Sequence, residues 1–107
     1  MSEYNPDKCV ILKITGEKGE VLLKVLAGWS GSYLEGQSWK VNSGISKCEV
    51  DGNYFMLHGY SGSVYKCHKK AYGTNMIMCG IISQLEDVPN VQVLSEEDAL
   101  KEIEAIP

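Results

Sequence analysis

Apolar and polar residues alternate over several short runs of this chain, a pattern typical of β-strands with one buried face. The runs Cys9–Thr15 and Val21–Leu26 are rich in apolar side chains, many of them β-branched, and Gly16-Glu17-Lys18-Gly19 separates them. Glycine and charged residues in such a break indicate a turn, so residues 8–27 are predicted to form a β-hairpin. The preceding residues 1–7 are polar and are expected to be frayed.

A three-stranded antiparallel meander is predicted for the middle of the chain. Ile45–Val50 and Asn53–Gly59 flank Asp51-Gly52, a dipeptide that favours a two-residue hairpin turn because both positions need positive φ. A second turn at Ser61-Gly62 leads into the third strand, Val64–Lys69.

The lengths of these two turns decide which side chains share a face, because side chains alternate along a strand. With two central residues in each turn, Cys48 lies opposite Phe55, and Cys67 lies opposite Met56. One face then looks like core and carries Cys48, Phe55, Leu57 and Val64, with Lys66 and His68 toward its edge. The other face is aromatic and polar, as expected of a half-exposed binding face, and carries Lys47, Tyr54, Met56, His58, Tyr60, Tyr65, Cys67 and Lys69.

The last third of the chain combines one ambiguous segment with one clear helix. The apolar residues of 75–85 fit either a buried strand or one face of a helix, and we predict a strand. Val91–Leu94 is a further short strand. Ser95 is a good N-cap and acidic residues follow it, so residues 96–105 are predicted to form a helix.

These elements predict a single domain over residues 1–107 of the α+β class. The hairpin and the meander make it mostly antiparallel β, as a sheet or a small open barrel, with a C-terminal α-helix packed on it.

One phrase occurs twice and supplies the candidate binding residues. Leu26–Ser32 and Leu57–Ser63 both read Leu, any residue, Gly, aromatic, Ser, Gly, Ser, and a tyrosine follows each copy. Such glycine-serine turns are predicted to present aromatic rings, which give large contact areas in protein interfaces. The residues predicted to bind a partner are Trp29, Tyr33, His58, Tyr60 and Tyr65. Trp39 is expected to belong to the core.

Charge makes a dedicated nucleic-acid protein a less favoured alternative. The formal net charge is −4, and residues 85–107 contribute −6 of it, from seven acidic residues and one lysine. The chain has no arginine, the side chain best suited to phosphates and base edges. The one basic cluster contains Lys66, Lys69 and Lys70 beside Tyr65, and it is the alternative site, for nucleic acid or a nucleotide. Lysines on a strand edge also guard against aggregation.

Enzymatic and metal chemistry are not predicted. The two repeats resemble a serine nucleophile elbow but end in serine rather than glycine, and the elbow needs a longer α/β frame. A small hydrolase that uses His58 or a repeat serine is the third-ranked hypothesis. Cys9, Cys48, Cys67 and Cys79 form no C-x-x-C pair, and Cys48 and Cys67 are expected on opposite faces, so no metal, cofactor or disulfide is predicted.

The compartment is predicted from what the chain lacks. Its longest apolar run, Met76–Ile82, is far shorter than the roughly 20 residues that span a bilayer. The first residues have no basic start and apolar stretch of a secretory signal. A cytoplasmic protein with reduced thiols and no membrane partner is therefore expected.

About residues 39–73 resemble short uncharacterised proteins encoded by tailed bacteriophages and prophages. The resemblance is carried by Trp39–Gly44, Glu49–Tyr54, Gly59–Lys69 and Tyr72-Gly73. It implies an accessory phage protein that acts in the bacterial cytoplasm by binding and blocking a host enzyme or defence complex, and it implies no catalytic residues. We therefore predict a small non-enzymatic protein that acts by protein–protein contact.

Overall fold

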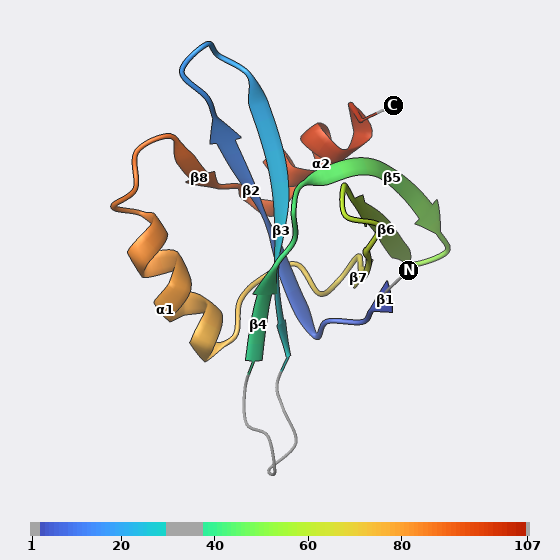
Figure 1. Ribbon diagram of the computed structural model, residues 1–107. Coiled ribbons are helices and arrows are strands. Elements are labelled where there is room, and N and C mark those ends of the chain that lie inside the picture. The colour runs from blue at the N-terminus through green and yellow to red at the C-terminus, as the bar shows by residue number, and fades with distance from the viewer. Residues whose placement is uncertain (1–2, 30–37, 107) are drawn as a thin grey trace.

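The computed structural model describes residues 3–29 and 38–106 (Figure 1). These residues form eight strands and two helices, which confirms the predicted α+β class with mostly antiparallel strands and a C-terminal helix. In chain order the elements are β1 (Glu3–Tyr4), β2 (Lys8–Thr15), β3 (Val21–Trp29), β4 (Ser38–Val41), β5 (Ile45–Asp51), β6 (Tyr54–Gly59), β7 (Val64–His68), α1 (Met76–Leu85), β8 (Val91–Val93) and α2 (Glu96–Glu104).

The strands form two four-stranded sheets. One has the order β4-β3-β2-β8 and the other the order β1-β7-β6-β5. The predicted hairpin is β2–β3, and the predicted meander is β5–β6–β7. The chain crosses from the first sheet to the second at residues 42–44, where β4 passes into β5 through the middle of the molecule (Figure 1).

The main core lies between the two sheets, and α2 closes one end of it. Its buried side chains come from β2 and β3, from β6 and β7, and from α2. Burying these apolar surfaces against one another is the main force that holds the sheets together. The largest fully buried side chains of this core are Tyr65, Ile11, Leu57 and Val25.

The other face of β2 and β3 packs against α1. Val10, Leu12 and Leu26 meet Met78 there, and all four are buried. Gly28 of β3 allows this close approach: a Cβ at this position would overlap the Met78 sulfur and would lie 2.7 Å from Met78 Cγ. The glycine of the first repeat therefore serves the packing of a helix on the sheet.

Two predicted elements were wrong. The segment predicted as a strand over 75–85 is the helix α1, and Asn75 is its N-cap, accepting a hydrogen bond from the Met78 N–H at 2.9 Å. Residues 1–7 were expected to be frayed, but Glu3 and Tyr4 pair in parallel with Val64 and Tyr65 of β7. The short β1 gains its order from the Tyr4 ring, which stacks on the Tyr65 ring at 5.0 Å.

The first hairpin turn of the meander lies one residue later than predicted. Asp51 pairs with Tyr54, so the central residues of the turn are Gly52 and Asn53. Cys48 consequently lies opposite Leu57 rather than Phe55. Moving the turn by one residue shifts the pairing of β5 with β6 by two residues. Because side chains alternate with a period of two, the side chains of β5 still share faces with the side chains of β6 as predicted.

The second turn has three central residues rather than two, and this exchanges the faces of β7. The Gly59 N–H donates to the Ser63 carbonyl at 2.7 Å, and Leu57 lies opposite Tyr65. Tyr65 and Cys67 therefore point into the core, and the prediction that they lie on the binding face is wrong. Cys48 and Cys67 therefore lie on the same face of the sheet. The prediction that they lie on opposite faces, which had argued against a metal site, is wrong.

Candidate functional site

The structure separates the four described residues of the five predicted to bind a partner. Tyr65 is buried, with 1% of its surface exposed. Trp29 is half-buried: its ring packs edge-on against Tyr4, with 6.2 Å between centroids, and its Nε1–H donates to the Asn5 carbonyl at 3.1 Å. Tyr33 lies outside the described residues. Among the four described residues of this set, Tyr60 is the most exposed, at 66%.

His58 lies on the outer face of the β5–β6–β7 sheet, because its neighbour Leu57 points into the core. Its Nε2 is 3.6 Å from a carboxylate oxygen of Glu49, and the same oxygen receives the Lys47 ammonium at 2.6 Å. The hydrogen bond from Lys47 and, to a smaller extent, the nearby imidazole lower the pKa of Glu49. Lys47 and Glu49 lie on β5 and His58 lies on the paired strand β6, so this group is an ion pair with an adjacent imidazole on the outer face of the sheet.

The serines near His58 are engaged elsewhere. Ser46 Oγ donates to the His58 main-chain carbonyl at 3.1 Å, and Ser61 Oγ lies 3.3 Å from Ser43 Oγ. Among the described hydrogen bonds, none joins a serine hydroxyl to the His58 imidazole. The serine–histidine contact that a hydrolase needs is therefore not formed between these residues.

The lysines of the basic cluster do not converge. The Lys66 ammonium lies 4.7 Å from the centre of the Tyr54 ring, and the Lys69 ammonium lies 5.5 Å from the centre of the Phe55 ring. Because Tyr54 and Phe55 are adjacent in β6, their rings lie on opposite faces of the sheet, and so do the two ammonium groups. Lys70 is exposed beyond the end of β7.

The thiols of Cys9 and Cys67 lie beside each other in the core. The neighbouring Cys9 thiol and burial both raise the pKa of Cys67, and burial with the Glu49 charge raises the pKa of Cys48 to about 11. Such thiols are protonated and unreactive at neutral pH. Among the described residues, no group of three or more His, Cys, Asp or Glu side chains could hold a metal ion.

A groove of about 330 Å³ opens beside Tyr60. It lies where β3 and β5 diverge, with α2 between them (Figure 1). Most of its lining is apolar, and its polar members are Ser46 and Glu102. The full lining is Val21, Leu22, Leu23, Ile45, Ser46, Tyr60, Glu102, Ala105 and Ile106.

The Tyr60 turn is fixed against the corner between β4 and β5. The Tyr60 N–H donates to the Gly44 carbonyl at 3.1 Å, and the Ser61 N–H donates to Ser43 Oγ at 3.1 Å. A Cβ on Gly44 would lie 2.9 Å from Tyr60 Cδ2, so the ring rests directly on this glycine. The exposed ring is therefore held in place before any partner arrives.

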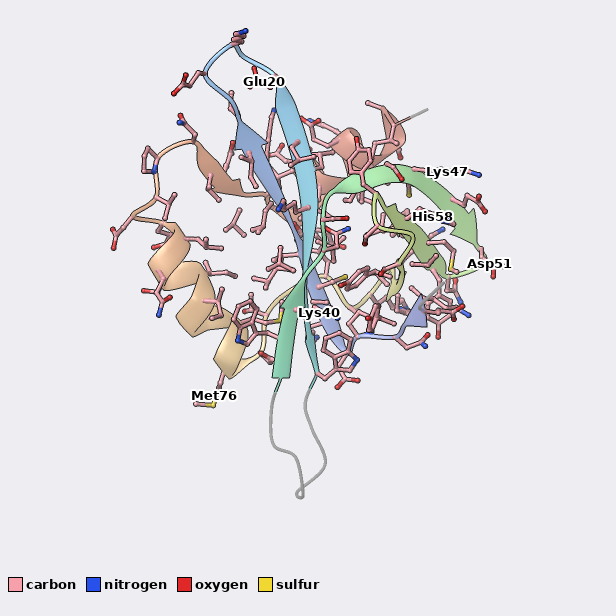
Figure 2. All side chains as sticks on the ribbon, viewed as in Figure 1. Glu20, Lys40, Lys47, Asp51, His58 and Met76 are labelled. Atoms are coloured by element: carbon pink, nitrogen blue, oxygen red, sulfur yellow. The ribbon has the colours of Figure 1, made fainter. Side chains whose placement is uncertain are left out.

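The groove borders the acidic helix α2. The Glu102 carboxylate in its lining is paired with Lys13 at 3.0 Å. Glu104 precedes the lining residue Ala105 and is exposed. The Glu20 carboxylate accepts the Lys18 N–H at 3.1 Å and so folds back over the turn, and Figure 2 shows Glu20 at the far end of the β2–β3 hairpin. The C-terminal end of α2, with its partial negative charge, also borders the groove at Ala105.

The sequence pattern singles out Tyr60 but none of the other residues that line the groove. Val21, Ile45 and Ile106 are far apart in the chain, and each belongs to an apolar pattern that also describes core residues. Val21 is 50% exposed, and this exposure depends on how the two sheets are arranged, which the local sequence does not predict. Trp39, expected in the core, is 44% exposed on the edge strand β4.

Comparisons with protein-family models, with curated proteins and with solved structures found no match to this chain. No helix among residues 3–29 and 38–106 is long and apolar enough to cross a membrane. The function is therefore inferred from the geometry of the groove.

Proposed function

We propose that this chain is a non-enzymatic binding protein that recognises a partner protein through the groove beside Tyr60. The observation that carries the proposal is an aromatic ring that is two-thirds exposed although its backbone is hydrogen-bonded to the β4–β5 corner. A fixed tyrosine loses little conformational entropy on binding, and tyrosines are enriched among the residues that dominate interface energies.

The lining favours apolar side chains of a partner as the occupants. Val21, Leu22 and Ile106 offer apolar surface, and exposed apolar surface of this kind marks interaction sites. Of the two polar lining residues, Glu102 is already paired with Lys13. A small polar ligand would find few convergent polar groups here, although such groups orient most small-molecule ligands.

The nucleic-acid alternative has less support from the geometry, because the ammonium groups of Lys66 and Lys69 lie on opposite faces of the sheet. A continuous basic track is what single-stranded nucleic acid requires. Phage origin and a partner in a bacterial host, both implied by the resemblance of residues 39–73, stay predictions.

The test compares capture of proteins by three immobilised forms of the full chain. Tyr60→Ser removes the ring from the groove rim, and Val50→Ser is the matched control, because Val50 is equally exposed at 60% but lies outside the groove lining. We expect a protein that the wild type and Val50→Ser both retain and that Tyr60→Ser loses. Equal retention by all three forms contradicts the proposal, provided that their melting temperatures agree.

A further inference from the structure

One edge of β3 is open where it borders the groove. The pairing of β3 with β4 runs from Trp29 back to Leu26, which lies opposite Val41. Asn42 adds one last contact, with its main-chain N–H donating to the Val25 carbonyl at 3.1 Å. In the part of the chain that the structure describes, no strand pairs with β3 on this side beyond Val25.

The open groups can be identified by alternation. The N–H and C=O of Val25 both point to the β4 side, toward Asn42. Backbone groups two residues apart in a strand point the same way, so those of Leu23 and Val21 also point to this side. Thr15 lies opposite Val21, but its N–H donates to the Asn90 carbonyl rather than to β3. The main-chain groups of Val21 are therefore not paired with Thr15, which agrees with their pointing to the other side.

We propose that the partner binds by strand addition: an extended segment pairs with the open edge of β3 at Val21 and Leu23 and places an apolar side chain in the groove. The proposal rests on the proposed function of the groove and names its mode of recognition. Exposed sheet edges are ready templates for an added strand, whose main chain supplies affinity while alternate side chains supply specificity.

The surroundings of the groove indicate the composition of that segment. Glu104, next to the lining residue Ala105, is exposed, and the C-terminal end of α2 faces the same region. Lysine or arginine next to the apolar anchor would therefore be favoured. A second copy of this chain is disfavoured as the occupant, because it would bring the same acidic groups together on a protein of net charge −4.

The test starts from a display library of random heptapeptides selected against the full chain, with binders resynthesised for affinity measurement. We expect sequences in which apolar residues alternate with lysine or arginine. Methylation of single peptide nitrogens should weaken binding about tenfold at alternate positions and little at the positions between them, since only every second N–H pairs with β3. Uniform effects of methylation, or no Tyr60-dependent binder at all, overturn strand addition.

A pair of variants tests the protein side of the same contact. Val21→Pro removes a groove-facing N–H at the first strand position, where proline is tolerated, and Val21→Thr keeps that N–H in a side chain of similar shape. We expect Val21→Pro to lose about tenfold in peptide affinity and Val21→Thr to bind nearly as the wild type does.

The outcomes separate the two proposals. If Tyr60→Ser abolishes peptide binding while Val21→Pro leaves it unchanged, the groove binds but strand addition is overturned. If neither variant changes the affinity, both proposals fail. Sedimentation of the free chain gives the remaining outcome: a dimer that Val21→Pro dissociates overturns the choice of a partner protein as the occupant. Should Val21→Pro prove unfolded by circular dichroism, the methylation series decides alone, because it leaves the protein unaltered.

Discussion

The side-chain oxygen of Asn42 accepts the N–H of Val25 at 2.9 Å, in the position where a main-chain carbonyl would continue the β3–β4 ladder. The chain can therefore leave the first sheet at this residue without stranding a buried donor. Asn42 is itself buried, and its amide nitrogen lies 3.4 Å from the Gly44 carbonyl. This side chain ends one sheet and begins the turn into the next.

Replacing Asn42 by leucine should destabilise the protein. The variant keeps a similar volume but leaves the Val25 N–H buried without an acceptor, which costs about 1–3 kcal/mol. Urea denaturation measures the loss. Asn5→Leu is the control, because Asn5 is exposed and accepts its hydrogen bond through the main chain, so its change should stay within about 0.5 kcal/mol. Equal stability of the two variants would contradict the role of Asn42.

Replacing Tyr72 by phenylalanine should also cost stability. The Tyr72 hydroxyl donates to the Leu94 carbonyl at 2.6 Å and accepts the Ile11 N–H at 3.0 Å, so it joins β2 to the residue after β8. Without the hydroxyl both main-chain groups lose a partner, at a cost of about 1–3 kcal/mol. Unfolding in urea at pH 7 gives the difference, and an unchanged midpoint would argue against this bridge.

The contribution of Tyr72 should depend on pH in the alkaline range. Burial raises the pKa of Tyr72 from 10.0 to about 12 in the folded protein. The unfolded chain therefore loses this proton first, so the stability that the hydroxyl confers is fully present below pH 10 and declines as the pH rises toward 12. The difference in unfolding free energy between wild type and Tyr72→Phe should accordingly shrink over that interval. A difference that stays constant up to pH 12 would be inconsistent with the raised pKa.

Replacing the first glycine of each repeat, Gly28 or Gly59, by alanine should have different effects on stability. Gly28→Ala forces Met78 and α1 to shift, because the new Cβ would lie 2.7 Å from Met78 Cγ, and overpacking of this kind costs about 1–3 kcal/mol. At Gly59 the nearest atoms would be 3.5 Å away, an ordinary contact, so Gly59→Ala should be tolerated. Thermal unfolding of both variants tests the contrast, and equal melting temperatures would count against the close packing of α1.

Fluorescence should distinguish the two tryptophans. Trp29→Phe leaves Trp39, which is 44% exposed, and Trp39→Phe leaves Trp29, which is half-buried against Tyr4. Acrylamide should therefore quench the Trp29→Phe variant more strongly than the Trp39→Phe variant. The reverse order would show that Trp39 is the interior ring, as the sequence pattern suggested.

The strands could be predicted from the sequence, but the length of one turn could not. Ser61-Gly62 fits a two-residue or a three-residue loop, and Gly62 has a φ of +93° in the loop that forms. The choice depends on the contact between the Tyr60 N–H and Gly44, which is 16 residues away in the chain. A single residue of difference placed Tyr65 and Cys67 on the wrong face, whereas the exposure predicted for Tyr60 is confirmed.

The helix α1 was missed although a signal for it is present. Asn75 is a favoured N-cap residue and precedes Met76 directly. The helix is apolar on much of its surface, so its period is weak, and short apolar runs do not separate strand from helix. Its packing on Gly28, 50 positions before Met78, selects the helix, and such a contact is not encoded locally.

The passage of the chain through residues 42–44 couples the two sheets mechanically. Residues 38–51 supply an edge strand to each sheet, β4 to one and β5 to the other. Because these two edge strands are joined by only three residues, the loss of one from its sheet should also pull the other from its sheet. Heat should consequently melt both layers in a single cooperative event, with one peak in scanning calorimetry rather than two.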